Sequence, residues 1–393
     1  MCISKAEALR RQQDGRVLVA SAAAYAVACA ASWMQPLLLV EILRFKGGTE
    51  ASAGLVLTVE MLALSLSSIF YARVATGVSF ATVAIGGTTV AIIGNVLSLV
   101  APDHVSLLAT RILCGLGEGA TLMVASAALA RFDDPDRAYG KINAANILTG
   151  SLLIYAAPFL GGWTGGPTTF PTLLLFMLLL LPVLLIMPRG ERLRPPPAGE
   201  DGLAAGSFSP RLLIIGLAVL IASVSNAAVW SFCYVFGSHA GLGVAALNTI
   251  MAVAILFALA GSLLASVIGS RHGRTLPFAA GLIIVSFASF TLSHTTHPLA
   301  FEVAMAAYLT AMYFLIPYFF GYAAAEDASG RGAAMIGAIF LMSFAIGPYL
   351  GGIISQQFGY RPMGWLVLIA DSIAFLLLAA LSLFPQHTFN NAP

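Results

Sequence analysis

Charged residues are scarce in this chain. Only 9% of its 393 residues are Asp, Glu, Lys or Arg, whereas 59% are hydrophobic and the mean hydropathy is +0.92. Because soluble domains carry about 25% charged residues, this deficit excludes an ordinary soluble protein and indicates a chain that crosses a membrane many times. The formal net charge of +2 is too small to favour nucleic acid as a partner.

Cysteine is also scarce, and several catalytic motifs are missing. The chain has four cysteines, Cys2, Cys29, Cys114 and Cys233, without CxxC spacing, and three of them lie in apolar segments. We therefore predict neither a disulfide framework nor a metal site. The sequence contains no Walker-type phosphate loop and no HExxH motif, which argues against an ATP-driven pump or a metalloenzyme. We expect no cofactor and no enzymatic activity.

Apolar stretches long enough to cross a bilayer dominate the chain. Windows of about 20 apolar residues, bounded by charges, Pro or Gly, predict membrane helices. The twelve predicted spans are 17–40, 51–71, 79–101, 105–130, 138–160, 170–187, 211–236, 244–268, 276–295, 299–324, 332–355 and 363–384. The basic start of the chain resembles a signal peptide, but its apolar run continues to Val40. We therefore expect a retained first helix, and the even count places both termini on one side.

The basic residues assign the orientation of these spans. With the N-terminus inside the cell, fifteen of the nineteen Lys and Arg residues fall in cytoplasmic segments. Arg44, Lys46 and Arg361 fall outside, and Arg111 lies within a span. This distribution satisfies the positive-inside rule. The sequence thus predicts a multi-pass protein with both termini in the cytoplasm, in a bacterial inner membrane.

The chain divides into two halves that repeat each other. The longest hydrophilic stretch, 188–210, is rich in Pro, Gly and Arg, and it predicts a cytoplasmic linker between six-helix halves at 1–187 and 211–393. The segment Ala157-Pro-Phe-Leu-Gly-Gly162 in the fifth span recurs 190 residues later as Gly347-Pro-Tyr-Leu-Gly-Gly352 in the eleventh. Duplicated six-helix units are typical of secondary transporters.

Two opposite charges stand inside the fourth span. Arg111 and Glu118 are seven residues apart, which places them on nearly the same helix face and about 10 Å apart along the axis. Gly115, Gly117 and Gly119 leave that face without side-chain bulk. Because an intramembrane charge costs about 2.5–3.5 kcal/mol on insertion scales, we expect this polar stripe to face a cavity or a close-packed neighbour.

Carboxyl groups within the spans are candidates for proton binding. A membrane interior favours the protonated carboxyl, and a nearby guanidinium favours the ionised one, so a change in their separation can load and release a proton. Glu118 is the leading candidate, and a permanently protonated or paired packing residue is the alternative. Glu60, in the second span, has Arg111 as its only intramembrane base, which predicts either a charge relay or a static salt bridge. For Asp371, in the twelfth span, we favour a packing role over transport.

Several motifs resemble the major facilitator superfamily along essentially the whole chain. The loop after the eighth span resembles its Gly-x-Leu-Ala-Asp-Arg-x-Gly-Arg signature, with Ser270 in place of the acid. The fourth span resembles its Arg-x-x-x-Gly signature. The Glu at position 118, seven residues after Arg111, resembles the pattern of anion:cation symporters and spinster-like lipid transporters. The fifth span partly resembles the antiporter signature of drug/proton exchangers. The residues with conformational roles implied by this resemblance and by the repeat are Arg73, Arg271, Gly273, Arg274, Pro158, Gly161, Gly162, Gly347 and Pro348, and Pro317 is added because a proline within a helix commonly kinks it.

The resemblance implies that the first, fourth, seventh and tenth spans line a central cavity. Asn226, Trp230 and Tyr234 follow one another at intervals of four residues in the seventh span. The polar and aromatic candidates for contact with substrate are Arg111, Trp33, Gln35, Asn226, Trp230, Tyr234, Met312 and Tyr313. Aromatic and Met walls with few fixed charges suit an amphipathic compound, although any one of these side chains could instead pack against lipid or a neighbouring helix.

These observations predict an all-α membrane protein with twelve helices in two pseudo-symmetric bundles. The function expected from them is proton-coupled transport of a small organic compound by alternating access, with export favoured over uptake. Uptake of an organic anion together with protons is the alternative, supported by the pairing of Arg111 with Glu118. A receptor or enzyme on the same scaffold is a third hypothesis, which the short loops disfavour. We expect a monomer whose partners are its substrate, protons and the bilayer.

Overall fold

The described residues of the chain form twelve helices and no strands. The computed structural model describes residues 5–132, 134–164, 168–187, 209–269, 273–327 and 331–383. The helices are α1 (Lys5–Phe45), α2 (Glu50–Val74), α3 (Phe80–Val100), α4 (His104–Leu129), α5 (Pro135–Thr164), α6 (Thr169–Leu184), α7 (Pro210–His239), α8 (Val244–Ile268), α9 (Thr275–His294), α10 (Pro298–Glu326), α11 (Arg331–Phe358) and α12 (Pro362–Leu383). Each predicted span falls on one of them, so the expected twelve-helix fold is confirmed.

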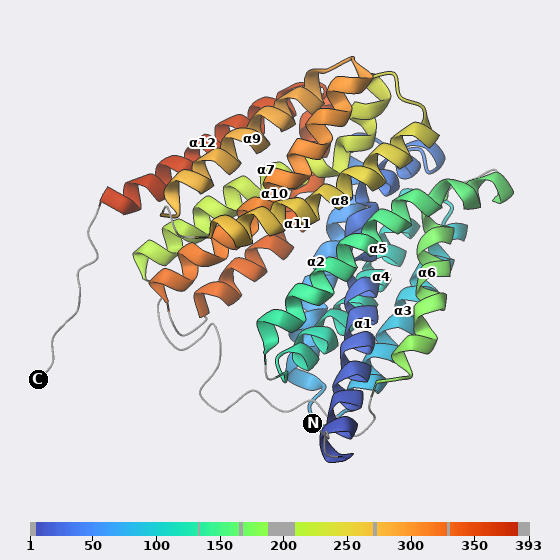
Figure 1. Ribbon diagram of the computed structural model, residues 1–393. Coiled ribbons are helices and arrows are strands. Elements are labelled where there is room, and N and C mark those ends of the chain that lie inside the picture. Colours follow the sequence, from blue (N-terminus) through green and yellow to red (C-terminus); the bar gives the residue numbers. More distant parts are fainter. Residues whose placement is uncertain are drawn as a thin grey trace, which may run out of the picture.

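The helices pack as two bundles, α1–α6 and α7–α12 (Figure 1). Eleven of the described helices are long and apolar enough to cross a membrane, and α6 is a shorter apolar helix. Most of the predicted linker at 188–210 lies outside the described residues, so the division at 187 and 211 stays a prediction.

Local signals in the loops start several of these helices. Thr49 caps α2 by accepting a hydrogen bond from the backbone of Ser52, at 3.3 Å. At α4, Asp103 accepts one from the backbone of Ser106 at 2.8 Å, and Ser106 in turn accepts one from the backbone of Asp103 at 3.3 Å, which is a capping box. The bonds from Ser106 lower the pKa of the exposed Asp103 carboxyl. Short polar loops of this kind end one apolar span and begin the next.

The first helix continues one turn beyond the predicted end at Val40 and includes Glu41. The Glu41 carboxylate accepts hydrogen bonds from the backbone amides of Thr168 and Thr169, at 2.5 and 2.9 Å, where α6 begins. A carboxylate is stabilised at a helix N-terminus because the free amides and the helix dipole both favour negative charge. Arg44 therefore lies in the last turn of α1 and not in a loop, and its expected position on the outer side stays a prediction.

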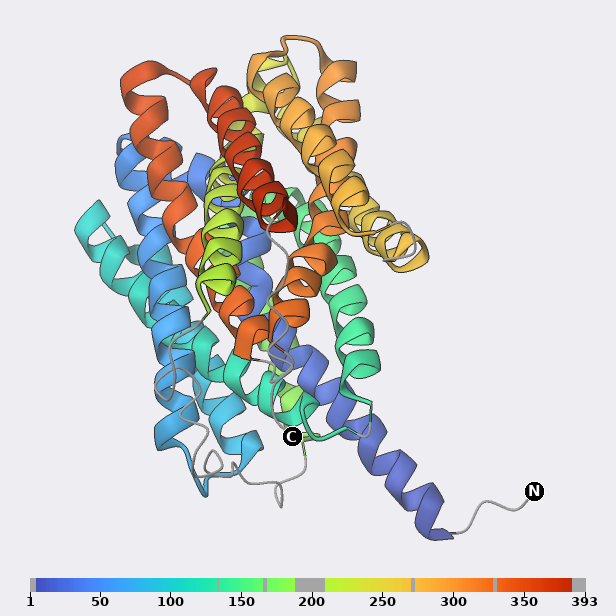
Figure 2. The same cartoon turned by 90° about the vertical axis from the view of Figure 1, so that its left-hand side faces the viewer.

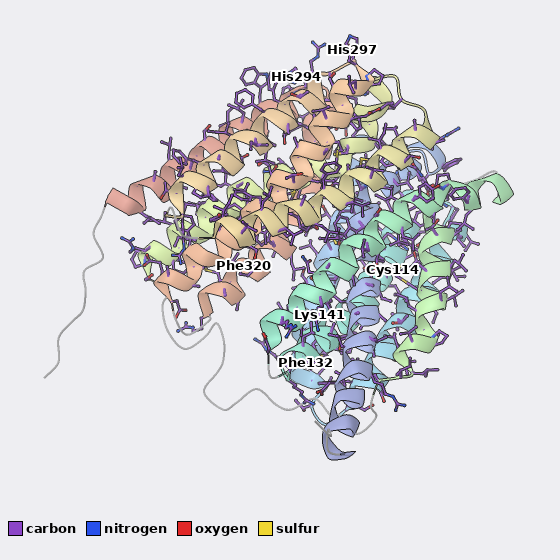
Figure 3. All side chains as sticks on the ribbon, viewed as in Figure 1. Cys114, Phe132, Lys141, His294, His297 and Phe320 are labelled. Atoms are coloured by element: carbon purple, nitrogen blue, oxygen red, sulfur yellow. The ribbon has the colours of Figure 1, made fainter. Side chains whose placement is uncertain are left out.

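The two bundles contact each other near the end that holds the loops α1–α2, α7–α8 and α11–α12, here called the shared end (Figures 1 and 2). There the Tyr360 hydroxyl donates a hydrogen bond to Glu50, at 3.0 Å. Burial and Glu50 together raise the pKa of Tyr360 to about 12, so this bond is present at neutral pH and is lost as the pH rises through that value. His294 and His297 lie at the same end of the second bundle, and Lys141 lies toward the opposite end of the first (Figure 3).

Close backbone packing joins α2 to α11 between the bundles. A Cβ added to Gly54 would lie 2.3 Å from the carbonyl oxygen of Pro348, and one added to Gly352 would lie 2.4 Å from that of Glu50. Only glycine permits helices to approach this closely. Thr58 adds a hydrogen bond to the carbonyl oxygen of Ala345. On the other side of the interface, Ser151 of α5 donates to the carbonyl oxygen of Ala252 of α8, at 2.8 Å.

Candidate functional site

Arg111 of α4 is the centre of a buried polar cluster within the first bundle. Its side chain is fully enclosed, and its Nη1 donates to Oε1 of Glu60 on α2, at 2.9 Å. Its Nη2 donates to Oδ1 of Asn95 and to Oγ of Ser98, both on α3, at 2.9 and 2.8 Å, and its Nε donates to the same Ser98 oxygen at 3.2 Å. The pairing of Glu60 with Arg111 is thereby confirmed, and two uncharged residues share the guanidinium.

The guanidinium is enclosed from two further directions. Its central carbon lies 5.2 Å from the centre of the Phe170 ring on α6, which is a cation–π distance. Its Nη2 also lies 2.8 Å from Sγ of Cys114, one turn along α4, and Cys114, labelled in Figure 3, is itself fully buried. Every described contact of Arg111 is thus made within the first bundle.

The glycines of α4 explain why two neighbouring helices come so close. A Cβ on Gly115 would lie 2.2 Å from the carbonyl oxygen of Glu60, and one on Gly119 would lie 2.2 Å from that of Leu64, both on α2. On the opposite face, a Cβ on Gly117 would lie 2.3 Å from the carbonyl oxygen of Gly87 on α3. The sequence-based expectation of a close-packed neighbour is therefore confirmed on both sides of the helix.

Glu118 lies in the same cluster without a hydrogen bond. It is fully buried, and neither of its carboxyl oxygens has a partner among the described residues. Glu60 uses Oε1 for Arg111, and its Oε2 is likewise unpartnered there. Glu118 is within electrostatic range of both Glu60 and Arg111, and of Cys29 on α1. Of the two buried carboxyl groups near the guanidinium, only that of Glu60 is bonded to it.

Aromatic side chains gather where α1, α7 and α10 meet. Trp33 stacks on Tyr313 with ring centres 6.1 Å apart, and it meets Trp230 edge to face at 6.0 Å. The two indole groups are fixed by hydrogen bonds, from Trp33 to Oδ1 of Asn146 at 3.2 Å and from Trp230 to the carbonyl oxygen of Ser32 at 3.0 Å. Three of the predicted substrate-binding residues thus form one cluster, which spans the two bundles.

Gln35 and Tyr234, two further predicted substrate-binding residues, also make contacts at the interface of the bundles. Gln35 bridges the bundles, because it donates to the carbonyl oxygen of Phe344 and accepts from Ser231, each at 3.3 Å. Tyr234 donates to Asn248, which in turn donates to the carbonyl oxygen of Ile154 across the interface at 3.1 Å.

Asn226 points into the second bundle. There it donates to Asp371 at 3.3 Å, and together with Met312 it lines a small internal cavity of about 10 Å³.

The residues predicted to have conformational roles are spread over both bundles. Gly347 packs on the backbone of α7 and Pro348 on Gly54, while Pro158, Gly161 and Gly162 lie within α5 and Pro317 within α10. Gly273 has a φ of +75°, which favours glycine. Arg73 is exposed in the last turn of α2, and Arg274 stands at the start of α9. Arg271 lies outside the described residues.

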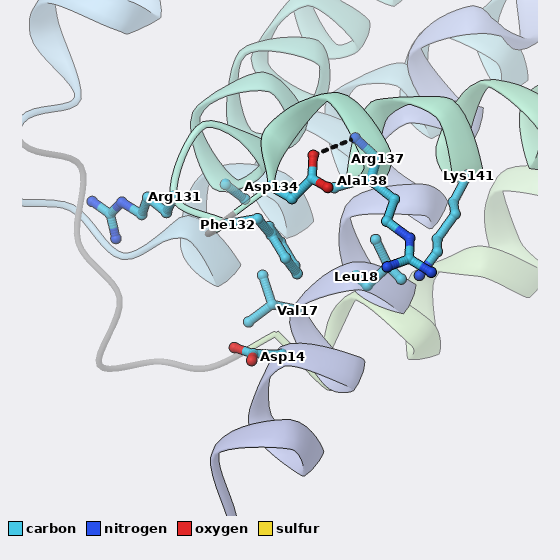
Figure 4. A pocket seen from close by; sticks show the side chains of 10 residues that line it. Asp14, Val17, Leu18, Arg131, Phe132, Asp134, Arg137, Ala138 and Lys141 are labelled. Carbon is cyan, nitrogen blue, oxygen red and sulfur yellow. Dashed lines mark hydrogen bonds between the residues drawn. The ribbon is translucent and has the colours of Figure 1, made fainter. Parts of the chain in front are cut away.

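A separate hollow of about 260 Å³ lies at the end of the first bundle opposite the shared end (Figure 4). Arg137 and Lys141 of α5 and Asp14 of α1 line it, and Asp134 accepts a hydrogen bond from the backbone of Arg137 at 3.0 Å. The hollow contains none of the predicted site residues. Its basic side chains are among those that the positive-inside rule assigns to the cytoplasm.

The twelve described helices form two bundles, with ionisable side chains enclosed among the helices, and define an integral membrane protein with the architecture of a transporter. The sequence profile of the Major Facilitator Superfamily matches residues 21–326, which is most of the chain. The chain belongs to the major facilitator superfamily. A search of curated proteins gives no match.

Solved structures share the fold at low sequence identity. A bacterial homolog of the human lysosomal transporter Spinster, inward-facing and unoccupied, is 16% identical with a TM-score of 0.74, and the match covers 93% of this chain and 97% of that one. The nucleoside transporter NupG is 15% identical with a TM-score of 0.70, covering 95% of this chain and 100% of that one. These similarities establish the arrangement of the helices along nearly the full length.

Proposed function

We propose that this protein is a proton-coupled transporter that moves a small, amphipathic organic compound by alternating access, with export favoured over uptake. The observation that carries this proposal is the pair of buried carboxyl groups near Arg111, of which Glu60 is bonded to the guanidinium and Glu118 is not. A family fold made of two bundles supplies the scaffold for alternating access. The gradient of protons across an inner membrane supplies the energy.

The arrangement of charges supports a proton on Glu118. Arg111 neutralises Glu60 directly, so a second ionised carboxylate nearby would be buried without its own countercharge. Such a charge is costly in a low-dielectric interior, and a carboxyl group avoids the cost by taking up a proton. When the helices shift so that Glu118 gains water or the guanidinium, release of that proton becomes favourable. Proton binding and helix packing are thereby coupled at one site.

The contacts between the bundles support an inward-facing state. Hydrogen bonds join the bundles in the helix halves nearest the shared end, as at Gln35, Glu50 and Thr58. The positive-inside orientation assigns that end to the outside and the opposite end, with Arg137 and Lys141, to the cytoplasm. The cluster of Trp33, Trp230 and Tyr313 then forms part of the layer that closes the outer side. Its ring faces suit an aromatic or amphipathic substrate.

The coupling role of Glu118 is tested in proteoliposomes. A thermal-shift screen of amphipathic drugs and organic anions first identifies a ligand, whose radiolabelled form is then used for flux under an imposed pH gradient. Glu118→Gln should abolish gradient-driven flux and retain exchange of labelled for unlabelled ligand. The matched control is Glu302→Gln, because Glu302 lies near an end of α10, away from the described contacts of Arg111. Undiminished gradient-driven flux in Glu118→Gln would refute the coupling role.

The same assay decides the direction of transport. Export by exchange predicts that the ligand moves against the proton flow, whereas uptake of an organic anion together with protons predicts that the ligand accumulates with it. The enclosure of Arg111 by Glu60, Asn95 and Ser98 favours exchange, because in this conformation the guanidinium is already neutralised and saturated with acceptors. Accumulation of the ligand together with protons would show that the protein takes up an organic anion and does not export.

A further inference from the structure

The second bundle contains a buried acid that the site around Arg111 does not include. Asp371 lies in the middle of α12 and is 2% exposed. Its Oδ2 accepts a hydrogen bond from Ser286 of α9 at 2.8 Å, and its Oδ1 accepts one from Asn226 of α7 at 3.3 Å. Among the described residues no Lys, Arg or His forms an ion pair with it. An ionised carboxylate at this depth therefore lacks a countercharge, which is costly in a membrane.

A groove between α9 and α12 has Asp371 in its lining. It has a volume of about 390 Å³, and Asp371 and Ser286 lie in its lining together with apolar side chains. The helices α9 and α12 run side by side at the edge of the second bundle that is farthest from the first (Figure 1). Phe287 and Leu376, on the two sides of the groove, are 63% and 65% exposed, as expected of side chains that face lipid.

We propose that this groove binds a hydrophobic amine from the bilayer, with its ammonium group at Asp371 and its alkyl chain between α9 and α12. The charge of an ammonium group is complementary to the one carboxylate in the lining. Its N–H groups are donors for the remaining lone pairs of the Asp371 oxygens. The apolar walls accept a chain that already resides in lipid, so the ligand reaches the groove without crossing water.

The binding site reaches α7 through Asn226. The amide of this residue donates to Asp371, its backbone carbonyl accepts a hydrogen bond from Tyr308 of α10 at 2.8 Å, and its Oδ1 has no described partner. A ligand that draws the Asp371 carboxylate toward the groove therefore alters a contact with α7 itself. The proposal does not rest on the transport function, because binding is measured without flux.

The test is photolabelling of the purified protein in phosphatidylcholine nanodiscs. The probe is decylamine that carries a diazirine on its alkyl chain, and the reference probe is the same chain ending in a hydroxyl group. We expect the amine to label peptides from 279–287 and 368–376, and excess decylamine to compete with this labelling. Asp371→Asn should lower it by at least about tenfold, because a charge-assisted bond is lost. Glu302→Gln, which removes an acid that does not line the groove, should label normally.

Three outcomes would overturn the proposal. Equal labelling by the amine and the alcohol would remove the role of charge, unchanged labelling of Asp371→Asn would remove the role of the acid, and labelled peptides elsewhere would exclude the groove. A second variant, Ala279→Phe, fills the groove without touching Asp371 and should also reduce labelling. If Asp371→Asn fails to fold by size-exclusion chromatography, normal labelling of Ala279→Phe is sufficient to refute the site.

Discussion

Removal of Arg111 should destabilise the protein more than the loss of one contact accounts for. In Arg111→Met, Glu60 loses the donor at 2.9 Å and must either stay ionised without a countercharge or take up a proton, while Asn95 and Ser98 also lose their guanidinium partners. Breaking a buried ion pair from one side costs about 3–5 kcal/mol, because the remaining charge is left without compensation. We expect a loss of this size in the free energy of unfolding, measured by reversible unfolding in mixed SDS and maltoside micelles.

The double variant Arg111→Met/Glu60→Met provides the decisive comparison. Replacing both members of a buried pair by apolar side chains is often neutral or stabilising, so the double variant should regain most of the stability lost in either single one. The matched control is the pair Arg211 and Glu326, whose N–O distance of 3.0 Å is close to the 2.9 Å of the buried pair but whose side chains are 28% and 13% exposed. A more exposed pair contributes about 0–1 kcal/mol. Additive losses in the Arg111 and Glu60 variants would refute the reasoning.

Three further predictions concern packing and the shared end. A methyl group at Gly115 would meet the backbone of α2, so Gly115→Ala should lower the free energy of unfolding by about 1–3 kcal/mol. In the control Gly86→Ala the methyl group meets nothing, and the free energy of unfolding should rise by up to about 1 kcal/mol. The side chain introduced by Gly54→Leu should collide with α11 and open the shared end. In a background without native cysteines, the reporter Ala53→Cys should then react more with an impermeant maleimide. Tyr360→Phe loses its bond across that end, so it should increase the same labelling.

The sequence predicts the helices well because each apolar window is a local property. The end of α1 is the exception, since the charge of Glu41 predicts a loop residue, whereas the amides of Thr168 and Thr169 donate hydrogen bonds that stabilise it within the helix. That contact joins positions 127 and 128 residues apart, and no local pattern encodes it.

The candidate site is only partly predictable from the sequence, for a related reason. The pairing of Glu60 with Arg111 follows because Arg111 is the only base predicted away from the ends of the spans, but Asn95 and Ser98 were missed as partners of Arg111. They stand three residues apart in α3, one turn of a helix, and a polar pair at that spacing in an apolar span is a usable signal. Asn226 was assigned to a cavity from its spacing with Trp230, yet α7 is buried on nearly every side, so its periodicity does not indicate which face meets substrate.

The proposed proton site and the aromatic cluster are separated by one helix. Glu118 of α4 is in electrostatic range of Cys29 on α1, and Trp33 follows Cys29 by four residues on the same helix face. Trp33 in turn stacks on Tyr313 of the second bundle. If Glu118 takes up the proton, a shift of α1 against α4 would carry the effect directly to the contact between the two bundles. Substitutions on this face of α1 should therefore change the coupling of transport to protons without changing the Arg111 ion pair.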